Sequence, residues 1–147
     1  MFNSYMDLAF EEAQAAADRG EVPVGAVLVK ANRVIARAGN RTLELNDPTA
    51  HAELLVIRAG GLALESQRLI GCDLYVTLEP CPMCAAAISF ARIGRLYFGA
   101  LDEKSGGAES GVQYFSHASC HYAPEIYSGI GEKKSSELLK RFFAQKR

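Results

Sequence analysis

The sequence of 147 residues lacks a long apolar run, a secretory-type start and any internal repeat or linker. A membrane-spanning helix needs about 20 consecutive apolar residues, so no membrane partner is expected. The first twenty residues carry acids where a secretory signal carries bases, which predicts a cytoplasmic protein. With no linker, we expect one domain over residues 1–147. A chain of this size buries roughly 68–70% of its unfolded surface, so folding requires neither a disulfide nor a structural metal.

A strong overall charge is also missing. The formal net charge is −1, so nothing global attracts a polyanion such as nucleic acid. The charges are unevenly spread, because residues 133–147 hold six Lys or Arg against one Glu. A basic last helix could follow a phosphate backbone. Charge alone favours the plainer interpretation, a solvated helix face with a basic tail.

Hydrophobic periodicity predicts alternating helices and strands. The expected helices cover 4–18, 50–63, 80–90 and 132–145, and the expected strands cover 22–30, 33–39, 73–78, 95–100 and 125–130. Residues 101–124 are expected to form a loop with one helical turn. This order predicts an α/β fold with a mixed five-stranded sheet and helices on both faces. Thr49 is the candidate N-cap of the second helix.

Two short stretches carry residue types that a small core does not need. They read PTAHAEL (48–54) and EPCPMC (79–84), and both are predicted at strand-to-helix junctions. Ligands of open α/β sheets gather at such carboxyl ends of strands. Cys81 and Cys84 are three residues apart, so on a helix they share a face and can hold one ion. Two helix N-termini would then point at one place, where their dipoles favour thiolate.

His51 and Glu53 complete the pattern. On a regular helix, residues two apart point about 200° from each other, so an ion at the helix end meets only one of them directly. Two thiolates and an imidazole form a good zinc shell, which makes His51 the third predicted ligand beside Cys81 and Cys84. The fourth tetrahedral position stays open, as in catalytic sites, and we predict one Zn²⁺ per chain. Glu53 beside the ion is the predicted catalytic proton shuttle.

Other interpretations exist for parts of the pattern. A Cys-x-x-Cys alone also suits a redox pair, a structural zinc knuckle or two buried thiols. Cys120 and His121 could join Cys81 and Cys84 in a four-ligand structural zinc site, although that would leave the His-Ala-Glu stretch unexplained. Glu79 is expected to fix the proline turn that follows it rather than to act on a substrate.

The same residues resemble a known family. HAE (51–53) with PCPMC (80–84) matches the signature of the zinc-dependent nucleoside and nucleobase deaminases. The similarity to the bacterial tRNA-specific adenosine deaminases extends over nearly the whole chain. It is carried by EVPVGAVLV (21–29), NR (40–41), NDPTAHAE (46–53), LYVTLEPCPMC (74–84) and RIGRLYFGALDEKSGG (92–107). The resemblance implies a cytidine-deaminase-like three-layer α/β/α sandwich and a homodimer.

The resemblance also implies a reaction and a partner, namely conversion of adenosine to inosine at the wobble position of a tRNA anticodon stem-loop. Zinc-bound hydroxide would attack C6 of adenine, with Glu53 moving the protons. Asn40 would contact the target nucleoside and Asp102 the adjacent RNA. From the residues alone, Asn40 equally suits a turn and Asp102 a helix or turn cap. The basic final helix and the 101–124 loop are candidates to hold the RNA backbone.

Two alternative functions fit the zinc pattern. A deaminase of a free base or nucleoside, of the guanine or cytosine type, would carry the same ligands, and the match around Asn40 and Asp102 argues against it. A non-catalytic zinc-binding RNA module has no use for Glu53 beside its ion. The chain departs from the family at SCHYAPE (119–125), where an Asn-His pair is common, so the RNA contacts of that region are left open.

Overall fold

The computed structural model describes residues 4–145 and confirms the predicted α/β fold. The elements are α1 (Tyr5–Asp18), β1 (Gly25–Lys30), β2 (Arg33–Gly39), α2 (Ala52–Leu64), β3 (Cys72–Leu78), α3 (Pro82–Ala91), β4 (Arg95–Ala100), the 3₁₀ helix η1 (Tyr114–Ser116), β5 (Glu125–Tyr127) and α4 (Glu132–Gln145). None of the helices described is both long and apolar enough to cross a membrane.

The five strands form one mixed sheet in the order β2-β1-β3-β4-β5. β1 is antiparallel to β2 and to β3, whereas β3, β4 and β5 are parallel. Ala31 and Asn32 both have positive φ, 50° and 61°, and form the two-residue turn of the β1–β2 hairpin. Because β3 and β4 are parallel, their carboxyl ends meet at one edge of the sheet, and the loops that follow them start side by side.

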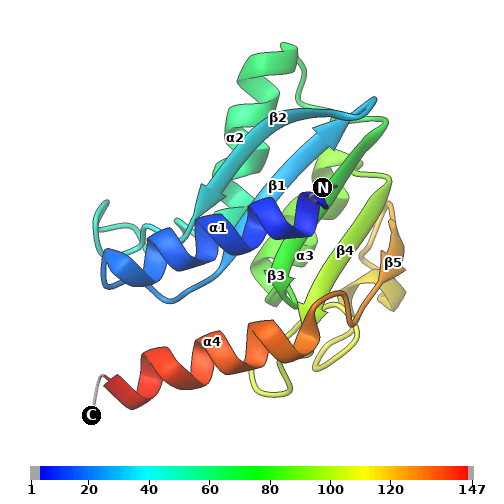
Figure 1. Cartoon of the computed structure of the whole chain (residues 1–147). Helices are drawn as coiled ribbons and strands as arrows, with labels where there is room; N and C mark the ends of the chain where they lie inside the picture. The colour runs from blue at the N-terminus through cyan, green and yellow to red at the C-terminus, as the bar shows by residue number, and fades with distance from the viewer. Residues whose placement is uncertain (1–3, 146–147) are drawn as a thin grey trace.

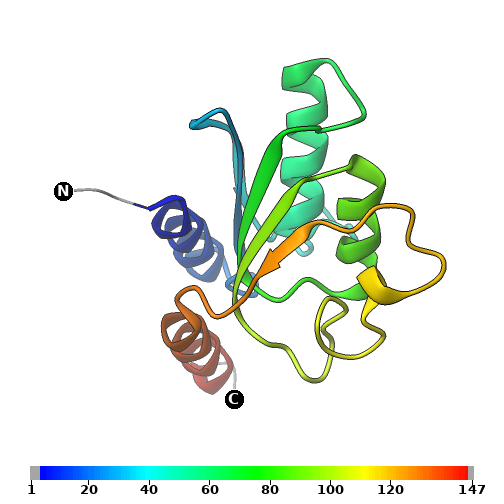
Figure 2. The same cartoon turned by 90° about the vertical axis from the view of Figure 1, so that its right-hand side faces the viewer.

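The sheet is covered on both sides (Figures 1 and 2). α1 and α4 lie on one face, and α2 and α3 lie on the other, as the edge-on view of the sheet in Figure 2 shows. The larger core fills the space between the sheet and the α2–α3 layer and includes Leu28, Leu74, Ile88 and Phe98, none of which is exposed. This layer fixes where α2 and α3 begin, and therefore where the side chains of their first turns point.

The helices α2 and α3 each start two residues later than predicted. His51 is the N-cap residue of α2 but makes no capping hydrogen bond through its side chain. Thr49, the predicted cap, instead donates its amide and hydroxyl hydrogens to Asp47 Oδ1, at 2.8 and 2.6 Å. Asp47, two residues earlier, accepts these hydrogen bonds as in an Asx turn, so the Thr49 hydroxyl does not cap α2. α3 begins at Pro82 rather than Pro80, with Cys81 as its N-cap residue. Proline at 82 suits the first helical position.

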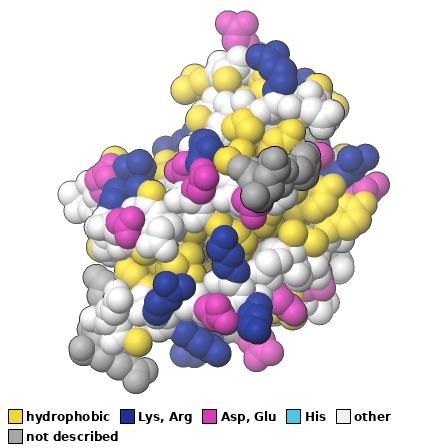
Figure 3. Space-filling view, viewed as in Figure 1, with side chains coloured by type: hydrophobic (Ala, Val, Ile, Leu, Met, Phe, Trp, Pro, Cys, Tyr) yellow, Lys and Arg dark blue, Asp and Glu magenta, His cyan; other side chains and the backbone are white. Residues whose placement is uncertain are grey.

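The chain after β4 also differs in detail. The last strand ends at Tyr127, three residues before the predicted end, because Gly129 and Gly131 both adopt positive φ (79° and 76°) and turn the chain into α4. The predicted basic segment is only partly described, since Lys146 and Arg147 lie outside the described residues. Figure 3 shows that Lys and Arg side chains in the region of α4 lie among acidic side chains, so the face in view carries no continuous basic patch.

Candidate metal centre and active site

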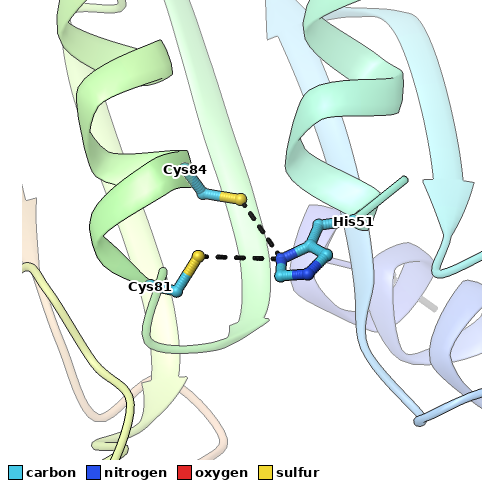
Figure 4. A group of neighbouring side chains, drawn as sticks. All are labelled: His51, Cys81 and Cys84. Carbon is cyan, nitrogen blue, oxygen red and sulfur yellow. Dashed lines mark hydrogen bonds between the residues drawn. The ribbon is translucent and has the colours of Figure 1, made fainter. Parts of the chain in front are cut away.

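The starts of α2 and α3 bring the two sequence motifs together. His51 is the N-cap residue of α2 and Cys81 the N-cap residue of α3, and both have extended backbone. Cys84 lies one turn further along α3 and is fully buried. Figure 4 shows the three side chains pointing toward one another from the two helix starts. Because His51 stands just outside α2, helical periodicity does not tie its direction to that of Glu53, in contrast to the prediction for two residues inside one helix.

The three side chains have the geometry of a zinc site. His51 Nδ1 lies 3.7 Å from Cys81 Sγ and 3.5 Å from Cys84 Sγ. All three candidate ligand atoms lie within 4.8 Å of one another. Tetrahedral zinc with Zn–S near 2.3 Å and Zn–N near 2.05 Å would hold nitrogen and sulfur about 3.6 Å apart. The donor set therefore fits zinc without rearrangement, and three protein ligands leave one tetrahedral position free.

The two thiols are strongly coupled in the metal-free protein. A hydrogen bond with Cys84 lowers the pKa of Cys81 to about 4, and the same hydrogen bond raises the pKa of Cys84. The pair therefore keeps one proton between two sulfurs. The hydrogen bond to Cys81 also raises the pKa of His51. A dication in the position of that proton would favour thiolate on both cysteines and a neutral imidazole, which are the ligand forms that zinc binds.

Glu53 lies in the first turn of α2 and is only 3% exposed. Burial raises the pKa of this carboxyl group to about 7 in the metal-free protein, against smaller lowerings by a hydrogen bond from its own backbone N–H and by the charge of His51. In the described part of the chain, no Lys or Arg side chain donates a hydrogen bond to Glu53. Glu53 lines the same pocket as His51 and Cys81. It is a buried acid beside the candidate ligands, as proton transfer requires.

Asn40 takes the capping role at α2 that was predicted for Thr49. It is 8% exposed, and its side-chain oxygen accepts a hydrogen bond of 2.8 Å from the backbone N–H of Ala52. Its backbone is fixed as well, because Arg19 donates to its carbonyl oxygen and its own N–H donates to that of Val24. With the oxygen engaged, the NH₂ group of the amide is the part available to a ligand, and Asn40 also lines the pocket.

The pocket over these residues has a volume of about 220 Å³. Pockets for drug-sized ligands usually measure about 300–1,000 Å³, so this one suits a single base with part of its sugar. Its lining consists of Val22, Val24, Asn40, Thr42, His51, Glu53, Leu78, Glu79, Cys81, Asp102 and Ser105. Most of the lining surface is apolar, although many of the lining residues also carry a polar group, an arrangement that suits a flat aromatic ligand.

Comparison with known proteins identifies the family. A family model for the cytidine and deoxycytidylate deaminase zinc-binding region matches residues 2–100, more than half of the chain. The chain belongs to this deaminase family. It is therefore a zinc-dependent hydrolytic deaminase, and the His51, Cys81 and Cys84 cluster lies within the matched region.

Individual relatives agree with this assignment. A curated tRNA-specific adenosine deaminase from Agrobacterium fabrum is 63% identical over 143 residues, 97% of this chain and 94% of the relative. A solved structure from work on A-to-I editing by tRNA:A34 deaminases at the wobble position of transfer RNA has a TM-score of 0.91 at 64% identity. It covers 92% of this chain and 98% of its own. A guanine deaminase from Bacillus subtilis is 32% identical, with a TM-score of 0.66, and covers 99% and 98%.

Asp102 stands at the mouth of the deaminase pocket, in the loop after β4. Its carboxylate accepts a hydrogen bond of 3.0 Å from the backbone N–H of Ser105, so it caps a turn, as the residue type alone suggested. It also lines the pocket together with His51 and Glu53. The structure therefore shows the turn-capping role, and the carboxylate of Asp102 can accept further hydrogen bonds.

Cys120 and His121 lie apart from the cluster in this deaminase. Cys120 Sγ lies 3.5 Å from Ser89 Oγ and 3.1 Å from the carbonyl oxygen of Tyr122. Within residues 4–145, the only metal-type group of three ligands is His51, Cys81 and Cys84. A four-ligand structural zinc site that includes Cys120 and His121 is therefore not formed.

Two buried acids of the deaminase were missed or misjudged from the sequence. Glu21 and Glu79 are each 2% exposed. Burial would raise the pKa of each carboxyl group, but hydrogen bonds donated by backbone N–H groups outweigh it, and both pKa values lie below the usual range. Glu79 does not fix the proline turn after it, because its partners lie 23 to 31 residues away. The available signal was an acid next to a predicted buried strand, because Glu79 directly follows one and Glu21 directly precedes another.

Proposed function

We propose that this deaminase converts adenosine to inosine at the wobble position of a tRNA anticodon loop. The observation that carries the proposal is the buried carboxylate of Glu53 beside three zinc-type ligands at the base of a pocket of about 220 Å³. The similarity to tRNA-specific adenosine deaminases over 97% of the chain supports adenosine in tRNA as the substrate. The target base must leave its stack to enter such a pocket, and an anticodon loop is already single-stranded.

In the proposed mechanism His51, Cys81 and Cys84 hold the zinc ion. Zinc, when bound, supplies the Lewis acidity that activates water for attack near neutral pH. Glu53 accepts a proton from the attacking water as its oxygen bonds to C6 of adenine, and delivers that proton to N1. The bond from C6 to the exocyclic nitrogen then breaks, Glu53 relays the second water proton, and ammonia leaves. Burial of Glu53 keeps these transfers away from bulk water.

Asn40 and Asp102 are the proposed substrate contacts. Three hydrogen bonds hold Asn40, through its side-chain oxygen, its carbonyl oxygen and its backbone N–H. Its amide NH₂ remains for a hydrogen bond to the nucleoside. Asp102 sits at the pocket mouth, where the flanking RNA would pass. Beside it a second hollow, lined among others by Leu139, Lys140 and Phe143 of α4, continues from the pocket. This hollow supports the proposal that α4 and the loop after β4 hold the RNA.

A homodimer is the second part of the proposal. The outer side of the α2–α3 layer exposes large apolar side chains, with Leu62 83% and Phe90 66% exposed. A contiguous group of exposed apolar side chains would mark a protein interface, and a second copy of the chain could cover these two. Sedimentation of the wild-type protein and of a Leu62→Glu/Phe90→Glu double variant tests this part: the variant should sediment as a monomer and the wild type as a dimer.

The decisive experiment measures ammonia release by the zinc-loaded enzyme with four substrates in parallel. These are an anticodon stem-loop with adenosine at the wobble position, free adenosine, guanine and cytidine. We expect turnover of the stem-loop alone. Glu53→Gln should lower the rate about 10²- to 10⁴-fold, the usual contribution of general acid–base catalysis, while zinc content stays the same.

The other outcomes separate the alternatives. Turnover of guanine or another free base without turnover of the stem-loop would keep the zinc chemistry and refute the RNA substrate. If the zinc-loaded wild type turned over none of the four substrates, Glu53→Gln would have no activity to lose. That result would favour a non-catalytic RNA module. Quantifying zinc in both proteins ensures that a loss of rate is not a loss of metal.

A further inference from the structure

The carboxylate of Glu79 accepts five hydrogen bonds from both ends of one loop. The residue is 2% exposed and follows β3 directly. Its donors are the backbone N–H groups of Asp102 at 2.8 Å, Ala108 at 3.2 Å, Glu109 at 2.8 Å and Ser110 at 2.7 Å, and the hydroxyl of Ser110 at 2.8 Å. One buried side chain therefore closes the whole segment 102–110.

These bonds occupy both oxygens of Glu79. Oε1 accepts from Asp102 and from the Ser110 hydroxyl, and Oε2 accepts from three successive backbone N–H groups. No ion pair in the described part of the chain includes Glu79. A buried carboxylate is unfavourable unless its charge is compensated, and here four backbone N–H groups and the Ser110 hydroxyl of the loop compensate it. Glu79 lines the pocket but has no oxygen left for a substrate.

The clamped loop lies directly on the turn that carries the metal ligands. The N–H of Gly107 donates to the carbonyl oxygen of Pro80 at 2.8 Å. A Cβ atom on Gly107 would lie 2.5 Å from Pro82 N, and one on Gly106 would lie 2.5 Å from the Glu79 carboxylate. Both contacts are closer than side chains tolerate, so the Gly-Gly pair permits the close approach. The pocket wall and the start of α3 are thus joined through Glu79, Pro80 and Cys81.

We propose that Glu79 is a positioning residue, which holds the 101–111 loop against the metal-binding turn and thereby places the substrate-facing wall, Asp102 included. It touches neither the metal nor the reacting base. The proposal deepens the proposed function and rests on it where substrate binding is concerned. The hydrogen-bonded loop itself is independent of the substrate.

The direction in which RNA binding changes on removal of the Glu79 charge distinguishes a positioning role from a simple electrostatic effect. RNA is a polyanion, so removing a carboxylate near its binding site should strengthen binding if charge alone mattered. A positioning role predicts the opposite sign. In Glu79→Gln the amide NH₂ replaces one accepting oxygen. In place of Oε1 it faces the N–H of Asp102, whose hydrogen bond is lost even if the Ser110 hydroxyl turns to accept from the amide. In place of Oε2 it faces three backbone N–H groups and loses all three hydrogen bonds. The loop is then no longer held at both ends, and binding weakens.

The test compares Glu79→Gln with Glu109→Gln in steady-state kinetics on the anticodon stem-loop. Glu109 is exposed on the same loop, and the same chemical change leaves its backbone hydrogen bond intact. We expect Glu79→Gln to raise KM about tenfold and to change kcat less than about twofold, with zinc content unchanged. Glu109→Gln should leave KM the same or lower it. A partly unfolded Glu79→Gln protein would instead lower apparent kcat at unchanged KM.

Amide hydrogen exchange supplies a readout that needs no substrate. In Glu79→Gln the amides of Asp102, Glu109 and Ser110 should exchange at least about tenfold faster than in the wild type and in Glu109→Gln. If the wild type does not turn over the stem-loop, the proposed function fails while this measurement still tests the clamp. Unchanged exchange at these three amides, or a fall in kcat with zinc loss at unchanged KM, would overturn the proposal.

Ser110→Ala covers the case in which Glu79→Gln does not fold. This variant removes only the hydroxyl donor and leaves the four backbone N–H donors in place. It should raise KM about two- to threefold and speed exchange at Ser110, with kcat and zinc content unchanged. No effect of Ser110→Ala on KM or on exchange would count against the clamp.

Discussion

The base of the pocket and its walls are built in different ways. We call the base the floor; it consists of the starts of α2 and α3, with His51, Glu53, Cys81 and Cys84. The walls are the two loops 40–50 and 101–111. Backbone hydrogen bonds of regular helices and the core beneath them hold the floor. Single buried carboxylates hold the walls, Glu21 on one side and Glu79 on the other.

The difference indicates a division of tasks. Metal binding and proton transfer require atoms held to within about half an ångström, and packed helix ends provide this. Substrate contacts belong to loops, which vary without disturbing the core. Changes in the floor should therefore abolish chemistry, whereas changes in the walls should alter binding and local stability. The following variants test this comparison in order of expected effect.

The largest effect is expected from Cys84→Ser in the floor. Serine is a much poorer zinc ligand than thiolate, and three ligands leave no spare donor. We expect zinc content to fall from about one ion per chain to nearly none, and turnover to fall by about three orders of magnitude or more. Metal analysis of the purified protein and ammonia release measure both.

Cys120→Ser is the matched control for that change. Its sulfur lies outside the cluster and hydrogen-bonds to the carbonyl oxygen of Tyr122, a bond that a serine hydroxyl also makes. Zinc content and turnover should stay at wild-type levels. If Cys84→Ser kept its zinc or Cys120→Ser lost it, the proposed ligand set would be wrong.

A smaller effect is expected where a wall meets the floor. Gly107→Ala would place Cβ 2.5 Å from Pro82 N, which forces the loop or the metal-binding turn to move. Overpacking of this kind usually costs about 1–3 kcal/mol, and we expect the free energy of unfolding to fall by about 2 kcal/mol. Urea denaturation measures this change.

Gly94→Ala tests whether the destabilisation expected for Gly107→Ala comes from the close approach to Pro82. A Cβ atom on Gly94 would lie 3.7 Å from the carbonyl oxygen of Cys72, an ordinary van der Waals distance. The free energy of unfolding should then change by less than about 0.5 kcal/mol. Equal destabilisation by both variants would mean that the general cost of replacing glycine, rather than the close approach at Gly107, decides the result.

The sequence predicts the floor better than the walls. The sheet and its covering helices follow from local periodicity, and the ligand residues follow from the few side chains that bind zinc at such spacing. The hydrogen bonds of Glu79 join positions 23 to 31 residues apart, and those of Glu21 join positions 21 to 23 apart. Nothing local specifies these pairs, so both acids gave only the signal of an acid beside a buried strand.

The same reason explains the misassigned cap of α2. Thr49 has the residue type and position of an N-cap, but Asp47 binds its hydroxyl, and Asn40 reaches across from the preceding loop to Ala52. A local rule cannot foresee a partner twelve residues away. The wall therefore also supports the floor at this point, since Asn40 belongs to the loop and its amide oxygen helps to fix the start of α2.

The smallest effect is expected from Glu21→Gln in the other wall. Glu21 accepts hydrogen bonds from the backbone N–H groups of Leu43 and Glu44 and from the hydroxyl of Thr42. These are three donors, against five for Glu79, so KM on the stem-loop should rise less than in Glu79→Gln. We expect the free energy of unfolding at pH 7 to fall by about 1 kcal/mol.

The pH dependence of that loss checks its origin. Burial alone would raise the pKa of Glu21, but its hydrogen bonds hold the pKa below the ordinary value of 4.5. Folding therefore favours the charged form, and the stability it contributes is fully present above about pH 4.5 and is lost as the pH falls through the lower folded-state pKa. The difference between wild type and Glu21→Gln should accordingly shrink below about pH 4. If the difference in unfolding free energy stayed constant down to pH 3, Glu21 would stabilise its loop by packing and not as a charged acceptor. The two walls would then not be held in the same way.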